Sequence, residues 1–375
     1  MTLPKMLLKK EEEVIFRLRA LFERFGYKKY KMSKFEEYDF YAENRNFLSS
    51  ENILTFSGLD GKLLALKPDV TLSIVKNTKG SYAIPERVYY NENVYRVRKG
   101  AGEFKEIMQV GLEYIGEVDR YATLEVIRLA QKSLEIVSDD YIMDISHMGF
   151  VMGMIEELGL SNAQNEALLK GISEKNAHSI QALCEKYNIK EELKNALIEM
   201  ASIYGTMEES LPKAKALCLN KKMEQALEEL EAVFSALRAN GGGENLKLDF
   251  SVVNGMDYYN GIIFQGFIYG VPSSILSGGR YDKLVQKLGK NSDAIGFAVY
   301  LDLLERYENR QKEYDTDILL LYEEKTDTAA LLKAVEMLTD NGQSVMVQKQ
   351  NNQMVKYRQL WSMKERGLEI IAEND

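Results

Sequence analysis

The stretch Arg87-Val-Tyr-Tyr-Asn-Glu-Asn-Val-Tyr-Arg96, with the segment Phe104 to Ile115 that follows it, contains the clearest indication of the fold. Both segments are rich in aromatic and β-branched residues, which are β-prone. This pattern is typical of β-strands. Because only a short, glycine-containing segment separates the two, we expect a strand-loop-strand unit here.

Working outward from this unit, the same signals predict a mixture of further strands and helices. Helical spacing of apolar residues predicts helices over 10–25, 71–77 and 119–137. Further strands are expected over 28–34, 63–66, 246–253, 258–269 and 294–300. Residues 277–281, which contain two glycines, are expected to form a tight turn that opens a helix over 282–288. The helices are grouped and do not alternate strictly with the strands, which favours an α+β fold.

The pattern also divides the chain into three regions. We expect a core built from residues 1–148 and 245–310, because strand-like segments recur in both parts. Between them, residues 149–244 are predicted to form an insertion of one helix after another. Residues 311–375 begin with a strand-helix-strand pattern, and a further helix and strand are expected to close the chain. This region is predicted to be a small α/β domain.

Composition excludes several classes of function. The 375 residues include 57 acidic and 48 basic ones, for a net charge of −9, which argues against a general surface for polyanions and mildly against tRNA. No apolar run approaches the roughly 20 residues that span a bilayer, and the N-terminus does not resemble a secretory signal. The two cysteines, Cys184 and Cys218, lie in no metal-binding pattern. We therefore expect a cytoplasmic protein without a metal, a cofactor or a membrane partner.

Four motifs resemble those of class II aminoacyl-tRNA synthetases. The opening stretch, continued to Gln109-Val-Gly-Leu-Glu113, is similar to their motif 2, and Gly278-Gly-Arg-Tyr-Asp282 with Ala294–Ala298 resembles the approach to their motif 3. Leu66-Lys-Pro-Asp-Val-Thr71 looks like their amino-acid-binding loop, and Gly255-Met-Asp-Tyr-Tyr259 is similar to a segment particular to histidyl-tRNA synthetases. Because the motifs occur in the family's order over residues 10–305, they support one another. The C-terminal region then resembles a truncated anticodon-binding domain.

This resemblance implies a pocket for histidine. A zwitterionic amino acid needs acceptors for its ammonium group and a donor for its carboxylate, and its imidazole needs a partner at each ring nitrogen. Carried over position by position, the resemblance assigns the ammonium group to Asp69, Thr71 and Gln109, the imidazole to Glu113 and Tyr259, the carboxylate to Arg96, and the pocket wall to Tyr281. In the amino-acid-binding loop, Lys67 replaces the family's usual arginine and Asp69 its usual glutamate.

The cations that such enzymes need for chemistry are missing from the matching positions. Amino-acid activation develops negative charge that fixed arginines stabilise, and the loss of one such group costs about 100- to 1,000-fold in rate. At three of these positions the expected arginine is replaced, by Glu103, Asn254 and Leu303. At a fourth position, the expected glutamate is replaced by Arg98. We therefore predict no catalytic residues and no aminoacylation.

The chain thus keeps the residues of a histidine pocket but lacks the catalytic arginines. In this combination it resembles the family of regulatory subunits that pair with the short form of ATP phosphoribosyltransferase. The resemblance implies a catalytic subunit as partner, activation of that subunit, feedback inhibition by L-histidine in histidine biosynthesis, and self-association as a dimer. It does not imply whether histidine binds in this pocket or at a subunit interface.

Two other functions remain open from the sequence. The chain could be an active histidyl-tRNA synthetase, which Asn254 and Leu303 argue against, or a synthetase-like sensor of tRNA or of an amino acid. Taken singly, Glu113 could be a carboxylate facing solvent and Tyr259 a core residue. His147 and His178 lie in no motif and are interpreted as structural.

Overall fold

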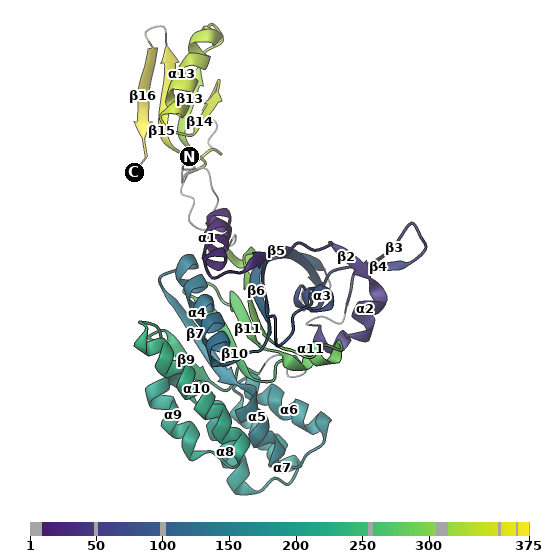
Figure 1. Ribbon diagram of the computed structural model, residues 1–375. Coiled ribbons are helices and arrows are strands. Elements are labelled where there is room, and N and C mark those ends of the chain that lie inside the picture. The colour runs from purple at the N-terminus through teal and green to yellow at the C-terminus, as the bar shows by residue number, and fades with distance from the viewer. Residues whose placement is uncertain are drawn as a thin grey trace. The chain divides into compact units, whose positions relative to one another are not determined.

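A computed structural model describes residues 10–48, 52–97, 103–253, 258–304, 314–351, 354–364 and 367–374. The chain divides into a larger unit, Glu11–Leu304, and a smaller unit that contains Glu305–Asp375 (Figure 1). Two of the predicted positions, Arg98 and Asn254, lie outside the described residues.

A nine-stranded sheet forms the centre of the larger unit. Its strands in spatial order are β1 (Lys28–Lys29), β5 (Glu86–Val97), β6 (Phe104–Gly116), β12 (Asp293–Tyr300), β11 (Leu276–Arg280), β10 (Ile262–Ile268), β7 (Tyr141–His147), β9 (Leu246–Asp249) and β8 (Tyr204–Thr206). Within this sheet, the β1–β5 and β7–β9 pairs are parallel, and the other described pairs are antiparallel. The predicted strand-loop-strand unit is confirmed as β5 and β6, which form the longest ladder of the sheet.

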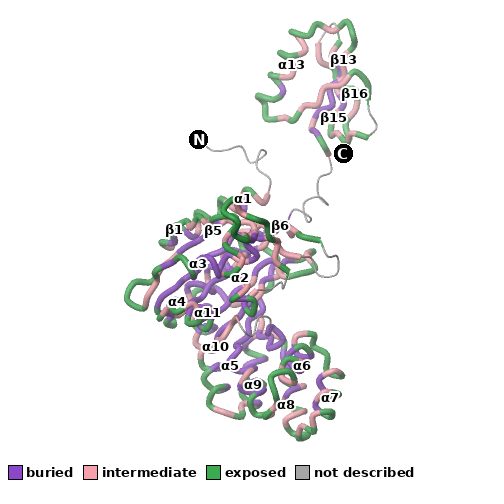
Figure 2. Tube along the Cα trace, turned by 90° about the vertical axis from the view of Figure 1, so that its right-hand side faces the viewer, coloured by how far each residue is buried: buried purple, intermediate pink, exposed green. Residues whose placement is uncertain are grey.

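One face of this sheet carries the main hydrophobic core. Helices α1 (Lys10–Arg24) and α4 (Arg120–Val137) contribute apolar stripes to this core, and Leu18 and Phe22 of α1 have no exposed surface. Asp119 caps α4 by accepting a hydrogen bond from the amide of Ala122. In Figure 2, the buried residues of the larger unit lie mainly in its interior, and exposed residues lie toward its outside.

The opposite face of the sheet carries a second, smaller core. It is covered by α2 (Tyr38–Glu43), the 3-10 turn η1 (Arg45–Phe47), α3 (Thr71–Asn77) and α11 (Asp282–Lys287). A three-stranded sheet, in the order β2 (Phe35–Glu37), β4 (Leu63–Leu66) and β3 (Thr55–Ser57), leads into α3. Because side chains alternate between the faces of a strand, Val88, Tyr90 and Val94 of β5 belong to this second core while Tyr89 belongs to the first.

A helical block occupies most of the predicted insertion. It consists of α5 (Met148–Glu156), α6 (Asn162–Ser173), α7 (Ala177–Lys186), α8 (Glu191–Ser202), α9 (Met207–Ala216) and α10 (Lys221–Ala239). The expectation of helices alone is wrong at one point, since β8 interrupts them. After α8 ends, the main chain of this segment bonds to the free edge of β9, which satisfies its polar groups better than a solvated loop would.

The expected turn at 277–281 is also wrong, because these residues form strand β11 and lead into α11. Gly278 and Gly279 are needed for close packing. A Cβ on Gly278 would lie 2.4 Å from the carbonyl oxygen of Gly296, and one on Gly279 would lie 2.7 Å from that of Ile262. The glycines therefore let the strands and their neighbours approach, which is a second common use of glycine within sheets.

The described residues of the smaller unit form a four-stranded sheet with one helix. The strand order is β14 (Val345–Gln348), β13 (Thr316–Tyr322), β15 (Tyr357–Lys364) and β16 (Gly367–Glu373), and α13 (Thr328–Asp340) packs on Ile318 and Leu320. The further helix expected near the end of the chain is wrong for the described residues, which form the antiparallel pair β15–β16. The α+β class is confirmed, whereas the limits 148, 244 and 310 stay predictions. Within the described ranges, the helices are too short or too polar to cross a bilayer.

The packing around Gly278 yields a first prediction. Gly278→Ala should lower the free energy of unfolding by about 3 kcal/mol, because its Cβ would meet the main-chain oxygen of Gly296 and the Cβ of Phe297, both at 2.4 Å, and neither can easily move aside. Gly61→Ala is the control: no atom lies within 4 Å of its Cβ, so only its left-handed φ of +81° should cost about 1 kcal/mol. Urea denaturation of both variants measures the difference. Equal losses would contradict the close-packing role.

Candidate functional site

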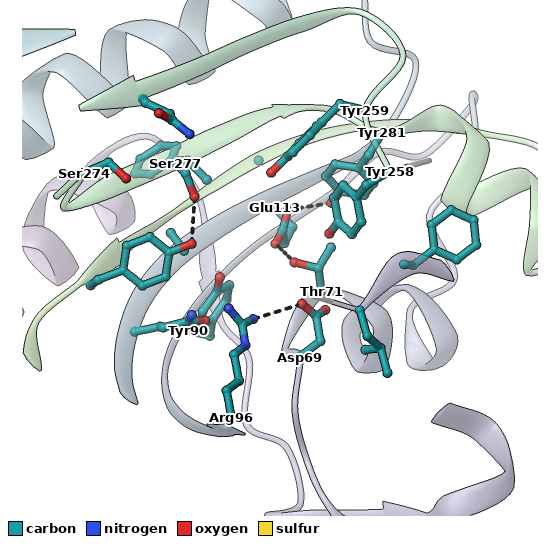
Figure 3. A pocket seen from close by; sticks show the side chains of 18 of the residues that line it. Asp69, Thr71, Tyr90, Arg96, Glu113, Tyr258, Tyr259, Ser274, Ser277 and Tyr281 are labelled. Carbon is teal, nitrogen blue, oxygen red and sulfur yellow. Dashed lines mark hydrogen bonds and ion pairs between the residues drawn. The ribbon is translucent and has the colours of Figure 1, made fainter. Parts of the chain in front are cut away.

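A cavity of about 590 Å³ lies on the second face of the nine-stranded sheet. Its floor is formed by β5, β6, β10, β11 and β12, and residues of η1, α3 and the segment before β10 contribute its walls. Figure 3 shows side chains from these elements pointing into one space. The volume lies in the usual range of sites for small molecules.

Glycines keep the floor of this cavity open. In the sheet register, Glu113 of β6 lies beside Gly296 of β12, which in turn lies beside Gly279 of β11. A Cβ on Gly296 would lie 1.8 Å from Oε2 of Glu113, and one on Gly279 would lie 2.8 Å from the ring of Tyr259. Only glycine at positions 279 and 296 therefore leaves room for the side chains of Tyr259 and Glu113.

Glu113 is the buried acid of the site. Only 2% of its surface is exposed, and its two oxygens accept hydrogen bonds from the hydroxyl of Thr71, at 2.6 Å, and from the hydroxyl of Tyr281. Burial raises the pKa of Glu113 to about 8, although both hydrogen bonds favour the ionised form. At neutral pH the group is therefore mostly a carboxylic acid, which can donate a hydrogen bond as well as accept one.

Asp69 and Arg96 form the charged part of the wall. The guanidinium of Arg96 donates from Nε to the carbonyl of Pro68, at 2.7 Å, and lies 3.3 Å from Oδ2 of Asp69. The other oxygen of Asp69 accepts from the amide of Leu72 at 2.9 Å, in the first turn of α3. Burial raises the pKa of Asp69, and the nearby Arg96 opposes this effect.

The loop before α3 is held against β5 by main-chain and side-chain contacts. Lys67 has only 1% of its surface exposed, and its ammonium group pairs with Glu92 of β5. Its carbonyl accepts from the amide of Tyr95 at 3.0 Å. A buried lysine is tolerated only when it is paired, so Lys67 fixes the loop that presents Asp69 and Thr71.

Aromatic residues close the site above Glu113. The rings of Tyr258 and Tyr259 meet edge to face at 4.7 Å, and the rings of Tyr258 and Tyr281 lie 5.5 Å apart. Burial raises the pKa of all three well above the ordinary value, so they remain phenols. Within the described part of the chain, neither the hydroxyl of Tyr259 nor the side-chain amide of Gln109 has a hydrogen-bond partner. Both groups line the cavity and are free for a ligand.

The structure brings all seven residues of the predicted site to this one cavity, namely Asp69, Thr71, Arg96, Gln109, Glu113, Tyr259 and Tyr281. Sequence reasoning missed the other lining residues, of which the polar ones are Asn46, Tyr90, Tyr258, Gln265, Ser274, Ser277 and Tyr300. Alternation along the strands could have found some of them, because Tyr90 lies on the same face of β5 as Arg96. The 2.7 Å contact between the hydroxyls of Ser277 and Tyr300 depends on strand pairing and had no local signal.

Two of the positions predicted to have lost their catalytic role are described, and neither lines the cavity. Glu103 is exposed just before β6, and Leu303 packs against the main core. Beside it, Asp302 forms an ion pair with Lys105. Among the described residues that line the cavity, only Asp69 and Glu113 have carboxyl groups, and only Arg96 is a cation.

Other polar side chains that could suggest chemistry have structural partners. His147 lies 3.1 Å from Glu229 and accepts a hydrogen bond from the amide of Gly149, so it caps α5. In the ranges that the structure describes, no three histidine, cysteine, aspartate or glutamate residues are grouped as metal ligands.

Comparison with known proteins connects this geometry to two related families. Residues 3–304 match the family model described as histidyl-tRNA synthetase. The ATP phosphoribosyltransferase regulatory subunit of Acetivibrio thermocellus is 32% identical over 88% of this chain and 81% of its own length. The protein of that name from Clostridium kluyveri is 33% identical over 87% of this chain and 86% of its own length.

Solved structures show the same similarity. A protein of Bacillus halodurans, described as an ATP phosphoribosyltransferase regulatory subunit/histidyl-tRNA synthetase, superimposes with a TM-score of 0.72 and 25% identity, over 93% of this chain and 90% of that one. A chain of the ATP phosphoribosyl transferase complex of Thermotoga maritima gives a TM-score of 0.60 at 18% identity, over 80% of this chain and 98% of that one, which shows a shared fold.

The raised pKa of Glu113 yields a prediction on stability. The folded state holds this proton up to about pH 8, whereas the unfolded chain loses it near the ordinary value of 4.5. The contribution of Glu113 to the free energy of unfolding should therefore fall between these limits, by up to about 1.4 kcal/mol per pH unit. Glu113→Gln should remove this fall and should unfold at a higher temperature than the wild type at pH 8 but not at pH 5.

The exposed Glu103→Gln is the matched control and should follow the wild type at both pH values. Thermal unfolding of the three proteins at pH 5, 6.5 and 8 provides the measurement. If Glu113→Gln kept the pH dependence of the wild type, the buried acid would not be the cause.

Proposed function

Since the chain belongs to the family of ATP phosphoribosyltransferase regulatory subunits, which shares the histidyl-tRNA synthetase fold, we propose that it binds L-histidine in this cavity. In this proposal, the chain activates the short-form catalytic subunit in the cytoplasm and inhibits it when histidine is bound. It serves histidine biosynthesis as a dimer within a mixed assembly and has no aminoacylation activity of its own.

The polar groups that line the cavity support histidine as the ligand. Glu113 and Tyr259 bracket the imidazole, and the protonated carboxyl group of Glu113 can either accept a ring N–H or donate to a bare ring nitrogen. Asp69, Thr71 and Gln109 receive the ammonium group. Arg96 has N–H groups beyond those used by Pro68 and Asp69, and these face the carboxylate. An apolar side chain of similar size would leave the hydroxyl of Tyr259 unpaired and would offer Glu113 no partner beyond Thr71 and Tyr281, so it is rejected.

This proposal rests mainly on one observation: the described residues that line the polar cavity include a single cation. Adenylate formation places negative charge on a phosphate and needs several fixed positive groups. Among the described lining residues, Arg96 is the sole cation, and Asp69 already neutralises it in part. The cavity therefore binds an amino acid and does not activate it.

Regulation follows when histidine prefers one state of the assembly. A ligand shifts an equilibrium only by the difference in its affinity for the two states. Histidine therefore binds the inhibited assembly more tightly than the active one, by about 5- to 150-fold for a typical coupling. If bound histidine lowers the affinity of the assembly for a substrate, that substrate lowers the affinity for histidine by the same factor, because coupling between two binding equilibria is reciprocal.

The decisive experiment is phosphoribosyl transfer to ATP by the short-form catalytic subunit, with and without this chain, across a titration of histidine. We expect activation by the chain and loss of that activation as histidine is added. In the variants Glu113→Ala and Tyr259→Ala, half-inhibition should need about 100-fold more histidine, because a buried partner of the imidazole is lost. Tyr269→Ala, at a residue 78% exposed, should behave as the wild type.

Two results would contradict the proposal at different levels. Unchanged inhibition in both cavity variants would reject histidine binding in this cavity while leaving the regulatory role intact. Failure of the chain to activate or to co-elute with the catalytic subunit would reject the regulatory role itself.

The lack of aminoacylation has its own test. Histidine-dependent exchange of pyrophosphate into ATP should stay at background, because Arg96 is the only cation among the described lining residues. An authentic histidyl-tRNA synthetase, assayed in parallel, provides the positive control. Exchange near the rate of that enzyme would favour the synthetase function instead, and retention of tRNA in a gel-shift assay would favour a tRNA sensor.

A further inference from the structure

Lys175 has a backbone conformation that its side chain does not explain. It follows α6 with a φ of +49°, in the left-handed region where glycine and asparagine are usual. The corresponding position after α7 is Asn188, with a φ of +55°, which is an ordinary choice. A lysine pays about 1 kcal/mol for this conformation, so its side chain should contribute something in return.

The side chain of Lys175 reaches the nine-stranded sheet. Its ammonium group lies 2.8 Å from Oδ2 of Asp249, at the end of β9, and 4.4 Å from the centre of the Tyr204 ring on β8. Asp249 is buried, with 3% of its surface exposed, and its other oxygen accepts from the amide of Ser251 at 2.9 Å. Lys175 thus joins the turn between α6 and α7 to the edge of the sheet through a buried carboxylate.

A second buried carboxylate lies beside this contact. Asp144 of β7 has 8% of its surface exposed, and its Oδ1 is buried without a hydrogen-bond partner. Its neighbours in the sheet register are Lys247 on β9 and the uncharged Gln265 on β10. Burial raises the pKa of Asp144 to about 6; Asp249 adds to this rise, and Lys175 and Lys247 oppose it. The phenol of Tyr204 faces the same two acids from β8.

We propose that Lys175 fastens the α6–α7 turn of the helical block to the sheet, and that the charge of Asp144 adjusts the strength of this fastening. Ionised Asp144 adds to the attraction that Asp249 exerts on the ammonium group, and protonated Asp144 does not. The fastening is therefore stronger above about pH 6 than below it. This device lies outside the proposed histidine site and stands independently of it.

Amide hydrogen exchange on the full chain tests the fastening. At pH 7.5, Lys175→Gly should lower the protection factors of α6 and α7 on the order of tenfold, because a charge-assisted contact is lost. Asn188→Gly is the matched control, since it makes the same backbone change at a left-handed position that carries no such contact. It should change protection less than twofold. Equal effects of the two substitutions would overturn the role of Lys175.

The part played by Asp144 is tested by repeating the comparison at pH 5. The loss of protection in Lys175→Gly should shrink to about threefold, because Asp144 is then protonated and only Asp249 is lost as a partner. In the Asp144→Asn background, the loss should be about threefold at both pH values. Ionisation of Asp144 also alters overall stability, so each variant is compared with its own parent at the same pH.

A loss of the same size at pH 5 and pH 7.5 in the wild-type background would overturn the contribution of Asp144. A pH dependence that persisted in the Asp144→Asn background would do the same, because another group would then be responsible. Both results concern the helical block alone and are independent of histidine binding.

Discussion

The burial of Glu113 over the backbone of Gly296 is the constraint on which the cavity depends. A carboxyl group this deep needs partners at both oxygens, and Thr71 and Tyr281 provide them from two different elements. Satisfying one acid therefore fixes the start of α3 and the start of α11 relative to β6. The glycine beneath the acid is equally necessary, because any Cβ there would occupy the same space.

The same arrangement is compatible with the proposed role of a synthetase fold as a sensor. In that proposal, recognition of the amino acid uses groups close to the sheet floor, where Glu113, Gln109 and Tyr259 lie. Chemistry on a phosphate needs cations around it, and the described wall offers only Arg96. Recognition and chemistry thus rest on different residues, so one can be lost while the other stays. Retaining the buried acid also preserves the packing of α3 and α11.

The helical block is attached to the sheet by three kinds of contact. Strand β8 adds main-chain hydrogen bonds at the free edge of β9, and Lys175 adds an ion pair with a buried acid nearby. The helices also share the main core, where Leu168, Ile172 and Ile180 have no exposed surface. Apolar packing of this kind does not respond to protons between pH 5 and 8, whereas a contact beside Asp144 does.

The sequence by itself determined the α+β class, the β5–β6 unit, helices α1, α3 and α4, and the seven residues that share the cavity, because local periodicity and ordered motifs carry that information. It did not determine the strand at 276–280, the β8 interruption or the β15–β16 pair. At these places, glycines and short apolar runs do not tell turns, helices and strands apart. Only the tertiary structure decided that burial raises the pKa of Glu113 and that Lys175 reaches Asp249. Protonation depends on how completely a group loses water, and long-range ion pairs depend on which strands become neighbours. Both are consequences of packing, which no local stretch of residues encodes.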